Sequence, residues 1–311
     1  MATREVGSDD DQDVHVAAPP QRPDPGSLTT SLAVAITSDD DRHPTQIYVP
    51  GMAEFIRYDV DGKVGTITID RAQKKNAMTF AMLGDFITAV AEAGDDERTA
   101  VLVITGVPGA FCAGTDLSDL ATVPGESRGL RGTAAERDRW WPIVQCPKPT
   151  ICAVDGPAVG MGAEFTSQCD LRLASTNARF GWNFVHRGLV PDTGAGTWLL
   201  PRIVGVQEAF RLLYTGEIIG ADEARRLGYL LGVVQPEELA ARTAALAEAV
   251  AAGSPHSMKL IKRLVYDGVT SPVDEHMTRH TEALSACFRS EDHKEGVASF
   301  LERRPAVFTG R

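Results

Sequence analysis

Residues Cys152-Ala-Val-Asp-Gly-Pro-Ala-Val-Gly-Met-Gly-Ala-Glu164 contain the end of an apolar strand, a glycine-rich turn and the start of a short helix. The backbone N–H groups around Met161 fall at the N-terminus of that helix. There they have no partner within the helix, and the helix dipole favours negative charge. Glu164 lies one turn further on, between two apolar residues. The stretch therefore predicts a site for an anion, such as an enolate oxygen, beside a carboxyl group.

The carboxyl group of Glu164 is the chemically active candidate in this stretch. Apolar surroundings disfavour its charged form and raise its pKa toward the range of a general acid or base. A plainer interpretation stays open, in which the stretch is a strand, a tight turn and a surface glutamate. The turn lacks the GxGxxG spacing of a dinucleotide site and the GK[ST] of a phosphate-binding loop, so neither ligand is predicted.

Composition narrows the class of protein. The chain has 311 residues, of which 43% are hydrophobic and 23% charged, as in ordinary globular proteins. Its formal net charge of -11 argues against nucleic acid or an anionic membrane as the main partner. We find no apolar run long enough to span a membrane and no secretory leader. The five cysteines show no metal-type spacing, which favours reduced thiols and a cytoplasmic location without a metal site.

The order of the elements predicts an α/β fold. Asp61-Gly62 joins two alternating strands into a hairpin. A helix is expected from about Thr79, and residues 100–105 form an unbroken apolar strand of the kind that is buried on both faces. Strand, helix and strand in this order imply a parallel crossover, and the pattern repeats through residues 150–154. Beyond Pro236 we expect only helices, over residues 237–252, 255–266, 272–288 and 291–302.

Three regions follow from this order. Residues 1–50 are rich in Asp, Pro, Ser and Thr and predict a disordered acidic N-terminal extension. Residues 51–250 predict the α/β core, and residues 251–311 a C-terminal helical region. A run of βα units followed by a run of helices is typical of a core with a helical appendage, for which contacts between subunits are a reasonable role.

Two further positions are candidates for the same site. The loop Phe111-Cys-Ala-Gly-Thr115-Asp follows a core strand, and ligands of open α/β sheets bind at the carboxyl ends of strands. If the N–H of Thr115 faces that of Met161, two donors converge on one oxygen, as an oxyanion hole requires; otherwise the loop is a turn that caps a helix. Asp192 precedes a helical stretch, so it is either an N-cap or a second carboxylate that shares acid and base roles with Glu164.

With these residues in view, the sequence resembles the enoyl-CoA hydratase/isomerase (crotonase) family from about Phe55 to the C-terminus. The motifs that carry the resemblance are Arg71-Ala-Gln-Lys-Lys-Asn-Ala-Met, Gly109-Ala-Phe-Cys-Ala-Gly-Thr-Asp-Leu, the stretch through Glu164, Cys169-Asp-Leu-Arg-Leu-Ala, and the segment from Phe180 to Arg202. The resemblance implies a crotonase-like spiral of ββα units whose C-terminal helices form a trimer or a dimer of trimers. It implies no metal or redox cofactor, because coenzyme A enters as part of the thioester substrate.

The resemblance also implies roles for individual residues. The N–H groups of Thr115 and Met161 would hold the thioester carbonyl, and Glu164 matches the first of two glutamates used by the hydratases. Phe184 stands where the second glutamate would fall. Asp192 matches an aspartate that several isomerases of the family use as base, and the segment around it is similar to the ring-epoxide isomerases of phenylacetyl-CoA breakdown. Contacts with the substrate and its coenzyme A are expected from Lys74, Ala113, Asp116, Leu117, Gly160, Phe184 and Lys262.

The leading prediction is an acyl-CoA enzyme that stabilises a thioester enolate while Glu164 and Asp192 transfer protons, in a double-bond shift or in the addition of water. An acyl-CoA hydrolase or decarboxylase with the same oxyanion hole is the alternative among enzymes. A non-catalytic acyl-CoA binding protein is the alternative from another class, and Phe184 is the residue that suggests it.

Overall fold

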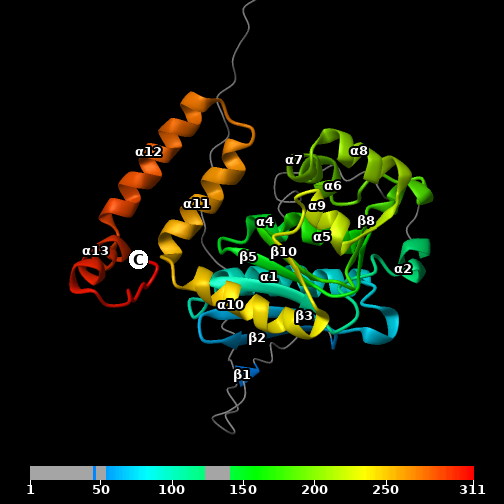
Figure 1. Cartoon of the computed structure of the whole chain (residues 1–311), viewed down its shortest axis with the longest axis horizontal. Coiled ribbons are helices and arrows are strands. Elements are labelled where there is room, and N and C mark those ends of the chain that lie inside the picture. Colours follow the sequence, from blue (N-terminus) through cyan, green and yellow to red (C-terminus); the bar gives the residue numbers. More distant parts are fainter. Residues whose placement is uncertain (1–44, 47–53, 123–140) are drawn as a thin grey trace, which may run out of the picture. The chain divides into compact units, whose positions relative to one another are not determined.

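The computed structural model describes residues 45–46, 54–122 and 141–311 (Figure 1). The predicted disordered extension lies outside the described residues except for Thr45–Gln46, which form β1. The division of the remaining chain near residue 250 stays a prediction. There the chain passes from α10, Leu239–Ala251, through a short turn into α11, Pro255–Gly268.

The main sheet of the described residues has the strand order β1-β2-β3-β4-β5-β7-β10. The predicted hairpin is present, because β2, Ile56–Asp61, pairs antiparallel with β3, Val64–Ile69. The strands that follow it pair in parallel, which confirms the predicted crossovers. They are β4, Val101–Gly106; β5, Thr150–Val154; β7, Leu171–Ser175; and β10, Gly232–Val234.

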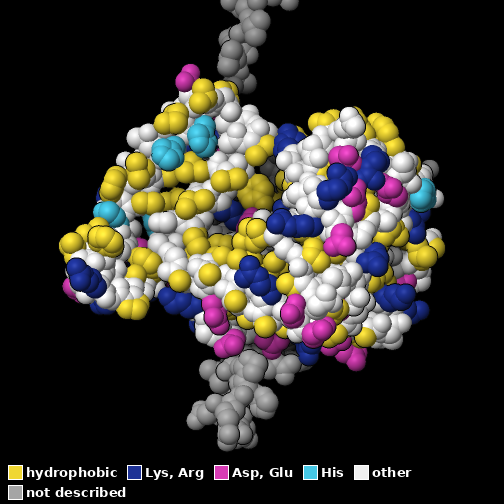
Figure 2. Space-filling model, viewed as in Figure 1, with side chains coloured by type: hydrophobic (Ala, Val, Ile, Leu, Met, Phe, Trp, Pro, Cys, Tyr) yellow, Lys and Arg dark blue, Asp and Glu magenta, His cyan; other side chains and the backbone are white. Residues whose placement is uncertain are grey.

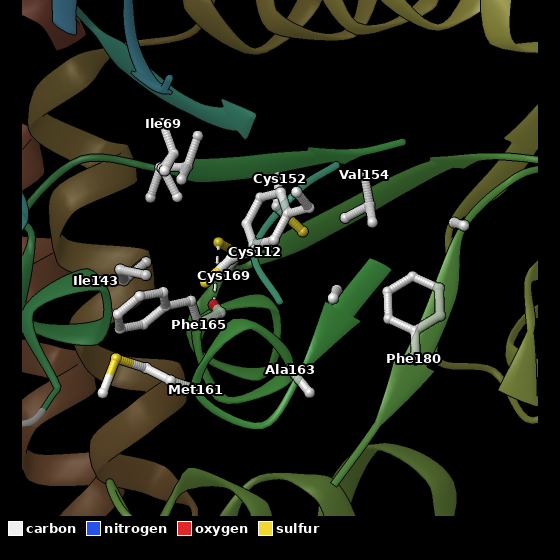
Figure 3. Close-up of a cluster of buried hydrophobic side chains, with 14 of the residues drawn as sticks. Ile69, Cys112, Ile143, Cys152, Val154, Met161, Ala163, Phe165, Cys169 and Phe180 are labelled. Carbon is white, nitrogen blue, oxygen red and sulfur yellow. Dashed lines mark hydrogen bonds between the residues drawn. The ribbon is translucent and has the colours of Figure 1, made fainter. Parts of the chain in front are cut away.

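The sheet is buried on both faces, as the apolar sequence of β4 predicts. On one face Leu102 and Ile104 of β4 belong to the cluster that contains Phe165 of α5, Met161–Gln168. Figure 3 shows part of this cluster around α5. On the other face Val101 and Val103 pack against α10, which crosses the sheet in Figure 1. Alternate residues of one strand therefore serve two cores.

The described residues also form a small second sheet, which was not predicted from the sequence. It consists of β6, Pro157–Val159; β8, Arg179–Gly181; and β9, Ile218–Gly220. Strands of three residues are too short to show a hydrophobic period, which is why pattern analysis misses them. β6 delivers the chain to the start of α5, and β8 delivers it to the short helix η3, Asn183–Arg187.

The helices between the strands place the remaining loops. α1 begins after Thr79, whose hydroxyl accepts a hydrogen bond from the N–H of Met82 at 3.1 Å, so the predicted start is confirmed. α1 spans Phe80–Asp95. The other helices and turns of this part are η1, Ala72–Lys74; α2, Leu117–Thr122; α4, Pro142–Gln145; α6, Ala195–Trp198; α7, Leu200–Val204; α8, Val206–Thr215; and α9, Ala221–Arg226.

The chain beyond Pro236 is helical, as predicted. After η4, Pro236–Glu238, and α10 come α11, then α12, Val273–Arg289, and α13, Glu291–Glu302. Hydrophobic side chains gather on the surface of α11 and α12 (Figure 2). Within the described residues, no helix is both long enough and apolar enough to cross a membrane.

Candidate active site

Two loops that follow neighbouring parallel strands lie against each other. Cys112, in the loop after β4, forms a parallel bridge with Ala158 of β6. Within it the N–H of Val159 donates to the carbonyl oxygen of Cys112 at 3.0 Å. The approach is so close that a Cβ on Gly162 would lie 2.1 Å from that same oxygen. A glycine is therefore required there, and the loop around Thr115 is held beside the first turn of α5.

Hydrogen bonds of the neighbouring residues orient the N–H of Thr115. Thr115 forms a parallel bridge with Met78. Met78 donates to the carbonyl oxygen of Gly114 at 2.8 Å and accepts from the N–H of Asp116 at 2.8 Å. Successive backbone groups of an extended segment point to opposite sides. The N–H of Thr115 consequently points away from Met78, and among the described residues it has no acceptor.

Met161 is the first residue of α5, and its N–H is one of the groups that a helix cannot satisfy itself. The N-cap residue, Gly160, has φ of 56°, in the region that favours glycine. A Cβ on Gly160 would lie 3.8 Å from the Cα of Gly114, so the segments that contain the two N–H groups are adjacent. The structure thus brings Thr115 and Met161 together, as the sequence analysis expected of an oxyanion hole.

A cavity of about 770 Å³ opens at this point, at the carboxyl ends of the parallel strands. Its wall contains both backbone donors and most of the predicted substrate contacts. Among its lining residues are Lys74, Ala113, Thr115, Asp116, Leu117, Gly160, Met161, Phe184 and Asp192. Asp116 is held there by Arg71, whose guanidinium lies 2.6 Å from its carboxylate. Hydrogen bonds from Ser118 and Arg71 lower the pKa of Asp116 to about 2, so it is a fixed charge.

Glu164 lies behind the cavity wall and is fully buried. Its Oε2 accepts a hydrogen bond from the hydroxyl of Thr193 at 2.7 Å, and its Oε1 has no partner among the described residues. Burial raises the pKa of Glu164 to about 8, and the negative charge of Asp192 adds to the rise. The predicted direction is confirmed, and at neutral pH this carboxyl group carries a proton.

Asp192 lines the cavity, as Asp116 does, whereas Glu164 lies behind its wall. Burial raises its pKa to about 6, a rise that the backbone N–H of Thr193 partly offsets. Asp192 therefore ionises before Glu164 as the pH rises, which is why its charge then acts on Glu164. At pH 7 one carboxyl group is ionised and the other protonated, a division that suits one base and one acid.

Phe184 occupies the position beside the proposed oxyanion donors. It belongs to η3, and its ring atom Cζ would lie 3.9 Å from a Cβ on Gly160. The side chain is buried and lines the cavity. An apolar ring thus covers the wall where the resemblance implied a second glutamate, so no water can be held there between two carboxylates.

Lys262 is the predicted contact that the structure places elsewhere. It does not line the cavity, and its ammonium group donates to the carbonyl oxygens of Ile143 and Lys148, each at 3.0 Å. It also lies 3.0 Å from a carboxylate oxygen of Asp170. With its three N–H donors used inside the protein, Lys262 has none left for a phosphate in this subunit. It joins α11 to the core instead.

Two contacts of the site were not predicted from the sequence. Thr193 contacts Glu164, and its carbonyl oxygen accepts a hydrogen bond from the indole N–H of Trp141 at 2.8 Å. A threonine next to a candidate aspartate carries no pattern of its own, and Trp141 lies 52 positions away in the sequence. Among the described residues, no cluster of His, Cys, Asp and Glu could hold a metal ion.

The fold and this cavity indicate a class of protein, an α/β enzyme whose cavity is lined by two residues with backbone N–H groups that are unpaired in the described part of the chain and lies beside a buried carboxyl group. Comparison with known proteins names the family. The family model for enoyl-CoA hydratase/isomerase matches residues 59–311. The chain is 35% identical over 262 residues to crotonyl-CoA hydratase of Syntrophomonas wolfei, a match that covers 83% of this chain and 99% of the relative.

Two other relatives agree. The 1,2-epoxyphenylacetyl-CoA isomerase of Escherichia coli is 34% identical over 264 residues, with 84% of this chain and 100% of the relative covered. The crystal structure of enoyl-CoA hydratase from Bacillus anthracis superposes with a TM-score of 0.77 at 29% identity, covering 83% of this chain and 100% of that one. The chain therefore belongs to the enoyl-CoA hydratase/isomerase family, and it is an acyl-CoA enzyme with the crotonase fold.

Proposed function

We propose that this enzyme shifts a double bond in an enoyl-CoA, with Asp192 as the base that takes up and returns the proton. The observation that carries the proposal is the position of Asp192. Asp192 is a lining residue of the cavity that both backbone donors line, and burial raises its pKa to about 6, so it is ionised at neutral pH. An ionised carboxylate beside the substrate is available to remove a proton from carbon.

The proposed reaction needs the charge that develops on the thioester to be stabilised. When Asp192 takes a proton from the carbon next to the thioester carbonyl, the electrons move onto the carbonyl oxygen. The N–H groups of Thr115 and Met161 would donate to that oxygen, and the dipole of α5 adds to their effect. Return of the proton from Asp192 to the far end of the dienolate completes the shift, with no atom gained or lost.

Isomerisation is favoured over hydration by the two residues that flank this base. Phe184 covers the wall with an apolar ring, and Glu164 has no atom on the cavity surface. Addition of water needs a carboxylate that binds and activates the water, and Asp192 is the candidate that remains for that task. A hydratase activity is nevertheless the second candidate function, because relatives such as crotonyl-CoA hydratase carry that name.

The proposal includes the coenzyme A part of the substrate, the oligomeric state and the cellular location. Coenzyme A would arrive as part of the substrate, with Lys74 and Arg187 of the cavity wall near its phosphates, and we propose no metal or redox cofactor. The assembly would be a homotrimer or a dimer of trimers, supported by exposed apolar side chains on α11 and α12, including Val265, Val273 and Met277. All five cysteines are unpaired, which supports a cytoplasmic location.

Turnover of 2-enoyl-CoA and 3-enoyl-CoA in heavy water tests the proposal. We expect the double bond to move and deuterium to enter the acyl chain, without the added mass of a water molecule. Asp192→Asn should lower kcat by about 10²–10⁴-fold, the scale of lost general base catalysis. The wild-type kcat should rise as the pH rises through about 6, because Asp192 must lose its proton to act.

The exposed carboxylate of α12 provides the control, since Asp274→Asn should leave turnover unchanged. A product heavier by the mass of one water molecule would show that the enzyme hydrates its substrate and does not isomerise it. Release of free coenzyme A or of carbon dioxide would indicate the hydrolase or decarboxylase, and a folded Asp192→Asn variant with wild-type turnover would remove Asp192 from the mechanism.

A further inference from the structure

We propose that Thr193 is a positioning residue, which sets Asp192 against the substrate by joining its loop to Glu164 on one side and to Trp141 on the other. The inference rests on the proposed function, because it takes Asp192 as the base. It gives Glu164 a second role as the buried acid that anchors this connection. Thr193 itself does not line the cavity, so it would act through its neighbours.

The contacts of Thr193 use nearly every polar group it has. Its hydroxyl donates to Oε2 of Glu164 at 2.7 Å and accepts from the N–H of Ala195 at 3.3 Å. Its carbonyl oxygen accepts from the indole N–H of Trp141 at 2.8 Å. Its own N–H stabilises the charged form of Asp192. One residue therefore contacts both carboxyl groups.

The partners of Thr193 are themselves fixed. Glu164 is fully buried in the first turn of α5, and a Cβ on Gly196 would lie 2.4 Å from its Oε1, so the backbone of α6 packs directly against the carboxyl group. Trp141 immediately precedes α4, and its ring lies 6.5 Å from that of Trp198. Because α5 and the segment at Trp141 are held by the core, the loop between them takes its position from Thr193.

The charged groups around Glu164 determine how this connection responds to pH. Asp192 is the titratable neighbour that acts on Glu164, and no charged side chain comes from α4 or α6 among the described residues. Burial raises the pKa of the Cys112 thiol, which lies near Asp192, to about 12, so it stays neutral. Lys74 and Arg187 line the cavity itself. Ionisation of Glu164 would place a second negative charge beside the base and the enolate, and activity should fall as the pH rises through about 8.

Thr193→Val tests the inference, because valine keeps the shape of the side chain and removes the hydroxyl. We expect kcat to fall about tenfold with little change in KM, since the residues that bind coenzyme A are elsewhere. The alkaline limb of the pH profile should move to higher pH, because the hydrogen bond from Thr193 lowers the pKa of Glu164. Thr193→Ser keeps the hydroxyl, so both its kcat and the position of the alkaline limb of its pH profile should match those of the wild type.

Trp141→Phe is the matched second variant. It removes the indole N–H that donates to Thr193, keeps a smaller aromatic ring, and should lower kcat severalfold without moving the alkaline limb. A Thr193→Val enzyme with wild-type kcat and an unmoved limb overturns the inference, and so does a Thr193→Ser enzyme that fails to recover. If Thr193→Val does not fold, the Ser and Phe variants decide the matter by the same measurements. Asp192→Asn assayed in parallel separates this inference from the proposed function, because an inactive Asp192→Asn beside an unaffected Thr193→Val removes only the positioning role.

Discussion

The two ends of α5 each have a carboxylate, and their surroundings are opposite. Asp170, just beyond the C-terminal end, accepts from the backbone N–H of Thr150 at 2.7 Å and the hydroxyl of Tyr266 at 2.9 Å, and it pairs with Lys262 at 3.0 Å. Glu164, in the first turn, accepts a hydrogen bond from the hydroxyl of Thr193, and among the described residues it forms no ion pair.

The difference separates a carboxylate that supports structure from one that can do chemistry. A partly buried carboxylate with a cation and several donors joins the elements that contact it. A buried carboxyl group without a cation keeps its proton to a higher pH, as Glu164 does. The same short helix thus joins α11 to the core at one end and forms the candidate active site at the other.

Breaking the pair at the C-terminal end should have the largest effect. Lys262→Met leaves the carboxylate of Asp170 without its cation, and removal of one partner from a buried pair costs about 3–5 kcal/mol of unfolding free energy. Urea unfolding would measure the loss, with Lys259→Met, an exposed lysine of the same helix, as the control. Unchanged stability together with weaker binding of coenzyme A would instead restore the role in substrate binding that the sequence analysis expected.

Removing the charge at the other end should change how stability depends on pH. The folded pKa of Glu164, about 8, lies above its ordinary value of 4.5, so the folded protein holds a proton that the unfolded chain has lost. The contribution of this group to stability is therefore greatest below pH 4.5 and is lost as the pH rises toward 8.

Glu164→Gln removes this dependence, because glutamine does not ionise and can still accept the hydrogen bond of Thr193. At pH 7 the variant should be more stable than the wild type by on the order of 3 kcal/mol, and near pH 4 the two should be similar. Urea unfolding across this pH range would show it, with Glu282→Gln, on the exposed surface of α12, as the control. Parallel curves for Glu164→Gln and the wild type would contradict the comparison.

The smallest effect is expected from the hydroxyl that Tyr266 contributes to Asp170. Tyr266→Phe removes the hydroxyl that donates to Asp170 at 2.9 Å, with a longer contact of 3.5 Å to the carbonyl oxygen of Gln168, and it leaves the ion pair with Lys262 in place. A lost hydrogen bond of this kind costs about 1 kcal/mol. Thermal unfolding should show a loss smaller than that of Lys262→Met, and an equal or larger loss would mean that the hydroxyl, not the cation, holds Asp170.

Much of the scaffold could be predicted because its signals are local. The hairpin at Asp61-Gly62, the apolar strand β4 and the helix that starts after Thr79 each depend on neighbouring residues, and each is present. The second sheet, β6-β8-β9, was missed, because its strands are too short for a periodic pattern and gain their stability from pairing across the chain.

The sequence by itself determined the strand, the glycine turn and the buried Glu164 of α5, since turn chemistry and apolar neighbours lie within one short stretch. It also determined the family, through several motifs that are weak singly. The tertiary structure decided which carboxyl group lines the cavity and which lysine is used inside the protein. Asp192 lines the cavity, next to Thr193, which contacts Trp141 and Glu164, and Lys262 of α11 pairs with Asp170. Such outcomes depend on distances between residues far apart in the chain, and those distances exist only after folding.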